Sequence, residues 1–588
     1  MKLIRDNRYT TIEFDTNKES TEFIAKFENE LGKVTGVRVP GYEKSAAYKG
    51  GYWDGYTRLY EKSKHRLPDG LYSQLENFIE ALQERADWLT YEVIDNKDEL
   101  FMEEDDIPDT LTFIDKGNEY SLFDYQYNSV KEALINGRGI LHLSVNSGKT
   151  GVSVALIKEI AKYLEKGEKV MYFVPTIAIF NQALKTMREN FGEANVGYLG
   201  DSKKKISKIN VVIMLSMVSA LKDPTQDKAV KITGKARTLQ IFIEEVAPML
   251  ENANPRLSLV NLAERYQPET KARAEIKQWL DEAVNKYYTN GKVLMFVNGK
   301  KAEFRKIVMG KIGPKYKKYE DAQKLLEDTR AIIVDEGHHS KSDTTYETLL
   351  KFSKAPYIFA MTGSIDKKDQ LSNQRLKALY EKVLYTVSND ELIKRGISAK
   401  PTINLINIKG TLDLEPGEDK NFQAVYTKGV VLNEDRNKII VGLAKKMYEA
   451  NKTSLLIVNR IEHGDILLEM FNKMGLPAEF ISGATPGDVR ERVITDVTND
   501  KLKILIATNI FDEGVSINNI DALFMVSSTK SLRLVLQRVG RVLRKKKKGE
   551  NKALVFDFVD MTHQFLKHHA SERQQIYRSE GFEMKHLN

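Results

Sequence analysis

The sequence contains no cysteine among its 588 residues. Disulfide bonds and zinc sites with cysteine ligands are therefore excluded, because both need thiols. The nine histidines form no pair at the spacing of a metal site beside a suitable carboxylate. A chain without thiols fits a reducing compartment, and we expect a cytoplasmic protein.

The sequence also lacks a long apolar run. No stretch approaches the roughly 20 apolar residues that a membrane span requires. At the N-terminus, charges at Lys2, Arg5 and Asp6 come too early for the apolar core of a signal peptide. We therefore expect no interaction with a membrane.

Charge of one sign is not in large excess. The chain has 90 Lys and Arg against 82 Asp and Glu, a net charge of +8. This surplus permits a polyanionic partner but does not require one, and an ordinary enzyme with a slightly basic surface is an equal alternative. The hydrophobic content of 41% is enough for sizeable cores, and the length predicts roughly three to four domains.

The order of apolar runs divides the chain into blocks. Residues 1–112 form a polar, aromatic-rich block with one helical pattern at 73–84, and an acidic run at 103–106 near Pro108 indicates a linker after it. From residue 113, apolar runs that predict strands alternate with helical spacing, which is typical of a parallel sheet with crossover helices. The expected strands of this block are 139–143, 169–174, 211–215 and 331–334, with a helix over 154–164.

Residues 222–328 interrupt this alternation. They are charge-rich, with helical patterns around 238–250 and 273–284, and Asn290-Gly291 within 287–294 predicts a hairpin turn. We interpret this block as an insertion into the first α/β domain, which then extends to residue 400. A second α/β domain, 401–588, has apolar runs at 454–458, 504–507, 522–526 and 553–556.

A candidate phosphate-binding loop follows the first expected strand. Residues 143–150 read Leu-Ser-Val-Asn-Ser-Gly-Lys-Thr and come between a strand and a helix. In that context the backbone N–H groups of the turn, with Ser147 and Gly148, face phosphate oxygens at the helix N-terminus. In such a loop Lys149 can neutralise β- and γ-phosphates, and Thr150 can place its hydroxyl on Mg²⁺. The loop has leucine at the usual first glycine position, and Gly-Lys-Thr by itself also arises by chance.

Two adjacent carboxylates end the strand at 331–334. Ligands bind at the carboxyl edge of a parallel sheet, where Asp335 and Glu336 are expected. Asp335 would hold Mg²⁺ through water, and Glu336 would orient and deprotonate the attacking water. The alternative is a pair of solvated acids in a strand-end turn.

A third candidate element is an arginine-rich helix in the second domain. Gln537, Arg541 and Arg544 are spaced i, i+4 and i+7, which places them on one helix face. Such a face suits a γ-phosphate approached from a second domain, with both arginines stabilising transition-state charge. The alternative is a basic, solvated helix face.

Together these three segments resemble the superfamily 2 helicases. The resemblance covers about 113–560 apart from the insertion. It implies the fold class: α/β, with two tandem RecA-like parallel-sheet domains, a small α+β N-terminal domain and a mostly helical insertion in the first RecA-like domain. It also implies ATP and Mg²⁺ as cofactors and nucleic-acid unwinding driven by ATP hydrolysis.

Four further segments match the family's motifs in order. The segment 123–126 resembles the motif that reads adenine through a glutamine, and 173–176 resembles the first strand-contacting motif. The segment 361–364 resembles the motif that couples hydrolysis to domain movement, and 507–517 resembles the fifth motif, with serine at 516 where many relatives carry aspartate. The resemblance assigns nucleotide binding to Gln126 and Gly514, coupling to Thr362 and Ser364, and backbone gripping to Pro175, Thr176, Ser216 and Thr508.

Within the superfamily, the chain looks most like the phage UvsW-type helicases, which unwind branched DNA. The segment 51–55 with 58–60 resembles their small N-terminal DNA-binding domain, which implies DNA contacts for Trp53 and Arg58, although a tryptophan beside a glycine turn is more often packed. A basic run at 300–319 with interleaved aromatic residues gives Lys300, Lys301 and Arg305 as further contacts, or else a solvated basic face. We expect a monomer on branched or forked DNA, located in the host cytoplasm if a phage encodes it.

Three other functions stay open at this point. An RNA helicase would use the same backbone-gripping motifs, because 2′-OH contacts are too local to read from sequence. The motor subunit of a restriction system is a second alternative, although no nuclease cluster of carboxylates and lysine is evident. A nucleic-acid scaffold with an inactive ATPase is the third, and the intact lysine, acids and arginines argue against it.

Overall fold

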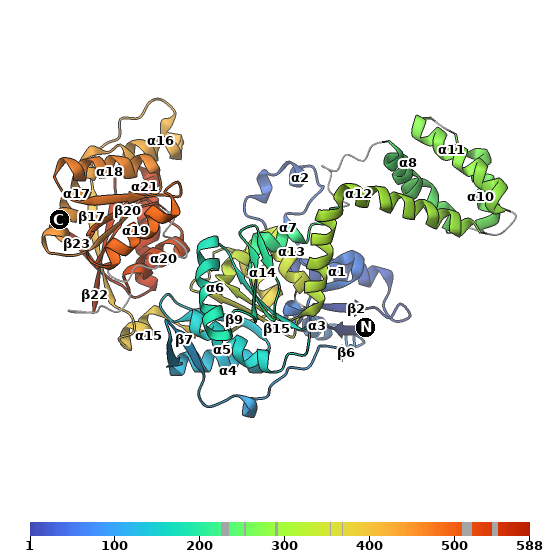
Figure 1. Ribbon diagram of the computed structural model, residues 1–588, viewed down its shortest axis with the longest axis horizontal. Helices are drawn as coiled ribbons and strands as arrows, with labels where there is room; N and C mark the ends of the chain where they lie inside the picture. The colour runs from blue at the N-terminus through green and yellow to red at the C-terminus, as the bar shows by residue number, and fades with distance from the viewer. Residues whose placement is uncertain are drawn as a thin grey trace. The chain divides into compact units, whose positions relative to one another are not determined.

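The computed structural model describes residues 1–224, 234–251, 255–267, 269–288, 292–352, 354–366, 368–508, 520–543 and 551–587. The chain divides into two compact units, one formed by Met1–Ser216 with Asp328–Asn588 and the other by Met217–Glu327 (Figure 1). None of the helices in these described ranges has the length and apolar character to cross a membrane.

The N-terminal domain is a small α+β fold, as expected from the sequence. Its sheet has the strand order β5-β2-β1-β6, in which only β1 and β6 pair in parallel. Leu31, Leu75 and Ile79 are fully buried on its helices. Its main elements are β1 (Lys2–Arg5), β2 (Tyr9–Glu13), α1 (Thr21–Val34), β5 (Arg66–Pro68), α3 (Tyr72–Gln83) and β6 (Glu92–Asp95).

The segment that joins this domain to the next is largely exposed but is anchored by three buried apolar residues. Met102, Ile107 and Leu111 flank the acidic run and are buried in the core of the first RecA-like domain. Only a single turn, η4 (Glu104–Asp106), carries the acids on the surface. The acidic run itself and Pro108 are exposed, and the apolar residues on either side of the run fix this segment to the core of the first RecA-like domain.

The first RecA-like domain contains the expected parallel sheet. Its strand order is β12-β11-β13-β10-β14-β15-β9-β16, and every neighbouring pair is parallel except β11 and β12. The strands are β9 (Arg138–Leu143), β10 (Lys169–Val174), β11 (Val196–Gly200), β12 (Lys203–Lys205), β13 (Ile209–Ile213), β14 (Thr329–Asp335), β15 (Tyr357–Thr362) and β16 (Val383–Val387). The expected strand at 211–215 ends at Ile213, because helix α7 (Met214–Ala220) begins there.

Strand order brings three candidate motifs to one edge of this sheet. Strand β15 lies between β14 and β9, so its carboxyl end comes between the ends of those two strands. The helices that follow or flank them are α4 (Asp124–Asn136), α5 (Lys149–Lys162) and α6 (Ile177–Phe191). Their apolar faces, such as Val152, Leu156 and Ile160 of α5, are fully buried in the core of this domain.

The second unit is helical, as expected for the insertion. Its helices are α8 (Lys235–Ile241), α9 (Ala247–Glu251), α10 (Pro255–Arg265), α11 (Lys271–Ala283) and α12 (Val293–Asp328), with π-helical turns at Phe242–Val246 and Val284–Tyr288 (Figure 1). They enclose a separate core with Phe242, Leu280 and Val297 at its centre. The unit thus has its own apolar packing.

The prediction of a hairpin at 287–294 is wrong. Tyr287 belongs to a π-helical turn, and Val293 and Leu294 begin α12, while the turn residues 289–291 lie outside the described residues. Asn-Gly favours a hairpin only between strand-forming segments. Here both neighbouring segments bury apolar residues at helical spacing, including Ala283, Val293 and Val297, and this tertiary packing decides the structure.

The second RecA-like domain has a fully parallel sheet of seven strands. Its order is β19-β20-β18-β21-β22-β17-β23. The strands are β17 (Lys400–Ile408), β18 (Ser454–Ile457), β19 (Ala478–Ile481), β20 (Ile504–Ala507), β21 (Ala522–Met525), β22 (Lys552–Asp560) and β23 (Glu583–Leu587). The four runs expected from the sequence are β18, β20, β21 and β22.

Candidate nucleotide and nucleic-acid site

The loop after β9 has the backbone shape of a phosphate cradle. Asn146 and Gly148 both adopt positive φ, 69° and 81°, and Gly148 is the N-cap of α5. The positive φ favours glycine at position 148, and a Cβ atom there would lie 2.2 Å from Gln126 Nε2 and so displace the Gln126 amide from the loop. Asparagine tolerates the left-handed region better than most residues, which explains why this loop can turn with so few glycines.

Lys149 and Glu336 form an ion pair across the edge of the sheet. The Lys149 Nζ atom lies 2.7 Å from Glu336 Oε1, and their side chains are only 18% and 17% exposed. Glu336 itself has a φ of 50°, a conformation that costs free energy in a non-glycine residue. The phosphate loop and the strand-end acids are therefore one site.

The two neighbouring carboxylates are shifted in opposite directions. Burial raises the pKa of Asp335, and the Glu336 charge adds to this shift although Lys149 opposes it. Burial acts in the same direction on Glu336, but Lys149 and His338 outweigh it and leave the pKa of Glu336 below its usual value. Glu336 is thus held ionised. The neighbouring Asp335 carboxyl group is the one whose ionised form a nearby cation would stabilise most.

Thr362 and Ser364 lie beside these acids. His338 Nδ1 is 3.1 Å from the Thr362 hydroxyl and 3.4 Å from Glu336 Oε2. The Thr362 hydroxyl donates to the Ser364 carbonyl oxygen at 2.9 Å. His338 connects the two motifs, and sequence reasoning gave it no role. Its place two residues after the catalytic acid candidate was the signal that could have found it.

Gln126 contacts the phosphate loop itself. Its side-chain amide donates to the Ser147 carbonyl oxygen at 2.8 Å and accepts from the Phe123 N–H at 2.9 Å. The Tyr125 hydroxyl donates to the same Ser147 oxygen at 3.1 Å. Gln126 is 4% exposed, and the Phe123 ring beside it is 55% exposed. The Gln126 amide thus holds the phosphate loop in place. The exposed ring of Phe123 forms an apolar surface beside Gln126.

The candidate residues of the second domain are only partly described. Helix α20 (Leu532–Val542) carries Gln537, whose Oε1 atom is buried without a hydrogen-bond partner among the described residues. Arg538 is fully buried and donates to Ser527 Oγ at 2.5 Å. The side chain of Arg541 and the whole of Arg544, Gly514 and Ser516 lie outside the described residues.

Helix α20 also contacts the phosphate loop. The Asn146 side-chain amide donates to the Gly540 carbonyl oxygen at 3.3 Å. A Cβ atom at position 540 would lie 2.5 Å from Val145 Cγ1, so only glycine permits this approach. The helix that carries the arginines and the loop that carries Lys149 are therefore neighbours.

The expected backbone-gripping residues occupy helix starts and strand ends. Thr176 is the N-cap of α6, where its hydroxyl accepts from the Ile179 N–H, and the neighbouring Pro175 is half-buried. Ser216 lies half-buried in α7, directly after β13, and Thr508 directly follows β20. Helix N-termini offer N–H groups without a partner inside the helix, which are suitable donors to phosphate oxygens, whereas the Thr508 N–H donates to the Ile481 carbonyl oxygen at 3.2 Å.

The N-terminal candidates already have partners within the protein. The Trp53 indole N–H donates to the Tyr56 carbonyl oxygen at 2.8 Å, and its ring is half-buried. Both terminal nitrogens of Arg58 pair with the Asp54 carboxylate. Tyr52, in the same segment, is 90% exposed and follows the Gly50-Gly51 turn.

The basic candidates of the insertion lie on α12. Lys300 is half-buried and stands over the Trp279 ring, 3.8 Å from its centroid. Lys301 pairs with Glu251 at 2.6 Å, and Arg305 is exposed. The whole basic run at 300–319 therefore lies on one helix.

Two family models match this chain in the order of the two domains. The model described as type III restriction enzyme, res subunit, matches residues 119–246 and 233–367. The model described as helicase conserved C-terminal domain matches residues 422–546. The ATP-dependent DNA helicase uvsW of Enterobacteria phage T4 is 22% identical over 90% of the chain and 86% of its own length. This chain belongs to the superfamily 2 helicases.

Other relatives match a smaller part of the chain. A Sulfolobus islandicus filamentous virus protein whose name describes a helicase is 26% identical over 40% of this chain, and IRC3 of Saccharomyces cerevisiae is 28% identical over 36%. This chain spans only 44% and 32% of those two proteins. Among solved structures, that of T4 UvsW aligns over 100% of this chain and 99% of its own, with 16% identity and a TM-score of 0.41.

Proposed function

We propose that this superfamily 2 protein hydrolyses ATP to drive movement along DNA and remodels branched DNA as a monomer. The observation that supports it best is the ion pair of Lys149 and Glu336, which joins the phosphate loop to the strand-end acids. A half-buried lysine facing a catalytic carboxylate is the arrangement that phosphoryl transfer requires, since catalysis there depends on positioning and charge.

In the proposed mechanism, the ion pair is the resting state of the site. When ATP binds, Lys149 exchanges the Glu336 carboxylate for phosphate oxygens. Without Lys149 beside it, the Glu336 carboxylate loses the main cause of its lowered pKa and becomes a stronger base, which can orient a water molecule and accept its proton. Backbone N–H groups of Ser147 and Gly148 hold the phosphates at the start of α5.

Magnesium fits the oxygen donors at this edge of the sheet. Mg²⁺ prefers oxygen ligands and usually needs only one or two protein groups beside the phosphates and water. Asp335 and Thr150 would supply them, and the raised pKa of Asp335 means that its ionised form would be favoured by an added positive charge. The ion would neutralise phosphate charge during transfer.

The second domain would complete the site from the side of the γ-phosphate. Arg541 and Arg544 would stabilise transition-state charge, with Gln537 beside them and Gly514 near the nucleotide. The contact of Asn146 with Gly540 supports this assignment, because it brings α20 to the phosphate loop. Thr362 and Ser364 would carry the change at Glu336 to the domain movement through His338.

DNA is proposed over RNA because of the N-terminal domain and the likeness to the T4 helicase. Pro175, Thr176, Ser216 and Thr508 would grip the phosphate backbone, with Trp53 and Arg58 of the N-terminal domain and Lys300, Lys301 and Arg305 of the insertion as further contacts. Such contacts do not read sequence, and they weaken as salt rises. Arg58 would have to leave Asp54 to bind phosphate.

The experiment is a comparison of ATP turnover with four nucleic acids: duplex DNA, single-stranded DNA, single-stranded RNA and a four-way DNA junction. We expect the junction to give the largest stimulation and, with each arm labelled, strand products from branch migration. Stimulation by RNA alone would replace the proposal with an RNA helicase. Stimulation by duplex DNA without any strand product would favour a translocating motor of the restriction type.

A further inference from the structure

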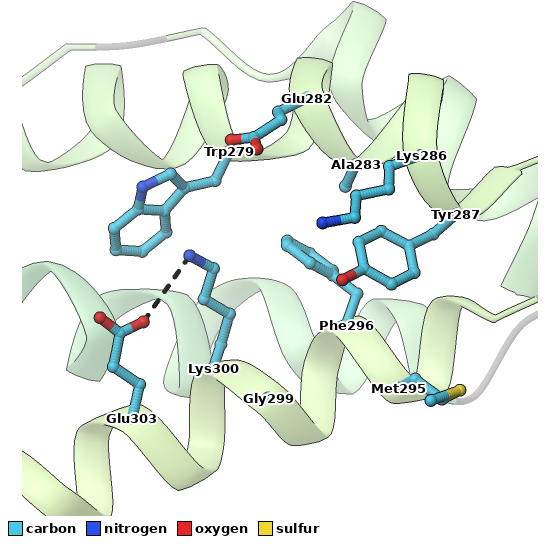
Figure 2. A pocket seen from close by; sticks show the side chains of 10 residues that line it. All are labelled: Trp279, Glu282, Ala283, Lys286, Tyr287, Met295, Phe296, Gly299, Lys300 and Glu303. Atoms are coloured by element: carbon cyan, nitrogen blue, oxygen red, sulfur yellow. Dashed lines mark ion pairs between the residues drawn. The ribbon is translucent and has the colours of Figure 1, made fainter.

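The helical insertion contains an aromatic-walled pocket of about 220 Å³ between α11 and α12. Its walls are the rings of Trp279, Tyr287 and Phe296, and its rim holds both amino and carboxylate groups (Figure 2). The residues on the rim are Glu282, Lys286, Lys300 and Glu303. No candidate catalytic group of the RecA-like domains takes part in it.

The Lys300 side chain extends over one aromatic wall of this pocket. Figure 2 shows its amino group pointing from α12 toward the face of Trp279, 3.8 Å from the ring centroid, and it lies 3.8 Å from the Glu303 carboxylate. Burial lowers the pKa of Lys300, which Glu303 opposes. A lysine that is partly desolvated between an aromatic ring and one distant carboxylate has spare capacity to donate hydrogen bonds.

The charge of the surrounding unit favours an anionic partner. Residues 217–327 contain 21 Lys and Arg against 14 Asp and Glu, a net charge of +7, whereas the whole chain carries +8. Nearly all of the chain's positive surplus therefore belongs to this unit. On α12, Arg305, Lys306, Lys317 and Lys318 are exposed, and within the described residues no carboxylate forms an ion pair with any of these four.

We propose that the pocket of Trp279, Tyr287, Phe296 and Lys300 binds a single unpaired nucleobase of a DNA strand whose phosphates lie along the basic side chains of α12. An aromatic wall can stack on any base, and a rim with both donors and acceptors suits the edge of a base. The inference rests on the proposed function, since it names how the insertion would hold a strand that the motor has separated.

The first test is a binding experiment with the full chain and no nucleotide. A single-stranded DNA oligonucleotide with 2-aminopurine reports base stacking by its fluorescence, and anisotropy of an end label gives the affinity. We expect quenching of 2-aminopurine by the unaltered protein and at least about fivefold weaker binding for Tyr287→Leu, because loss of one stacked base has at least that effect. Full quenching in Tyr287→Leu would overturn the proposal.

A charge-matched pair of variants separates the pocket from the general basic field. Lys300→Gln and Lys271→Gln each remove one positive charge, and Lys271 is exposed on α11, outside the pocket. We expect Lys300→Gln to reduce both affinity and quenching and Lys271→Gln to leave quenching unchanged. Equal effects of the two variants would mean that only the net charge matters and would contradict a base pocket.

Two controls keep the test independent of folding and of the motor. Circular dichroism and thermal unfolding check that Tyr287→Leu, whose ring is only half-buried, retains the helical bundle. Basal ATP hydrolysis reports on the proposed motor site alone. If Lys149→Ala retains full hydrolysis, the proposed function fails whatever the pocket binds, and if quenching is absent while hydrolysis is normal, only the pocket proposal fails.

Discussion

At the scale of single residues, the pair of Lys149 and Glu336 is the most sensitive point of the candidate site. Lys149→Ala removes the positive partner of the phosphates, and Glu336→Gln removes the base while keeping the shape. We expect each variant to lower ATP turnover by at least ~10², because each removes a transition-state contact or a proton acceptor. Steady-state phosphate release in the presence of DNA measures this, and full turnover in both variants would contradict the site.

Thr362 is expected to act on coupling more than on hydrolysis. Its hydroxyl contacts His338, which also faces Glu336, so the loss of this group should disturb how the domains respond to the nucleotide. For Thr362→Val we expect strand separation to fall about 2- to 30-fold further than ATP turnover, the usual range for residues that transmit coupling. Thr362→Ser keeps the hydroxyl and should restore the ratio of unwinding to hydrolysis.

His463 predicts a pH dependence of stability in the second RecA-like domain. It is fully buried, its Nε2 lies 2.9 Å from Asn437 Oδ1, and burial lowers its pKa from 6.5 to about 3. Below pH 6.5, His463 becomes protonated in the unfolded chain but stays neutral in the folded chain. The stability that neutral His463 allows is therefore fully present above pH 6.5 and is lost as the pH falls. The free energy of unfolding should drop by up to about 1.4 kcal/mol per pH unit.

Urea unfolding at pH 7.5 and 5.5 measures the His463 effect. His463→Gln should flatten the pH dependence, whereas His586→Gln, at an exposed position of β23, should leave it unchanged. Equal pH dependence in the unaltered protein and in His463→Gln would show that another group is responsible.

At the scale of elements, helix α21 (Gln564–Ser579) is fixed to β22 by a buried ion pair. Arg573 and Asp557 are each 1% exposed and 2.7 Å apart, and the Tyr577 hydroxyl donates to the same carboxylate at 2.7 Å. Removal of one partner leaves an uncompensated buried charge. Arg573→Met should therefore destabilise this domain by about 3–5 kcal/mol. Lys473→Met, in an exposed pair with Glu469, should change stability by less than about 1 kcal/mol.

The elements that the sequence predicted well are those with continuous apolar runs. The strand at 169–174 has the expected bounds, because a strand buried on both faces of a parallel sheet needs an uninterrupted apolar stretch. Strand β16 was not foreseen, since its burial is partial and its pattern weak. The hairpin at 287–294 failed because a local turn signal was overridden by the packing of α11 against α12.

The sequence predicted those parts of the candidate site whose motifs consist of residues that are contiguous in the chain. Lys149 was assigned from a loop between a strand and a helix, and Asp335 and Glu336 from the end of a strand; the structure brings them together at one edge of the sheet. The contact of Gly540 with Asn146 joins segments far apart in the chain, and no spacing rule shows such a contact. For the same reason the pocket of the insertion could not be read from the aromatic residues alone.

At the scale of the whole molecule, we expect the insertion and the RecA-like domains to have separate functions. The insertion leaves the sheet after β13 and α7 and returns at β14, and it has its own core. Replacement of residues 222–327 by a flexible linker should therefore keep basal ATP hydrolysis. It should also weaken single-stranded DNA binding. The plot of log affinity against log salt concentration should become less steep by about 0.7 for each phosphate that the insertion would otherwise neutralise.

Affinities of the full chain and the shortened chain at several salt concentrations measure this change. An unchanged slope would show that α12 does not bind phosphates. A loss of basal hydrolysis with normal unfolding behaviour would show instead that the insertion takes part in the ATPase cycle.

The proposed motor depends on one nucleotide being held by Lys149 and the acids of the first RecA-like domain and by the arginines of the second. The decisive measurement is the maximal DNA-stimulated ATP turnover of Arg541→Ala, together with its affinity for a fluorescent ATP analogue and with Arg578→Ala, an exposed arginine of α21, as control. We predict a loss of turnover of at least ~100-fold, with a much smaller change in nucleotide affinity, because an arginine finger acts in the transition state. Turnover of Arg541→Ala equal to that of Arg578→Ala would contradict this two-domain site.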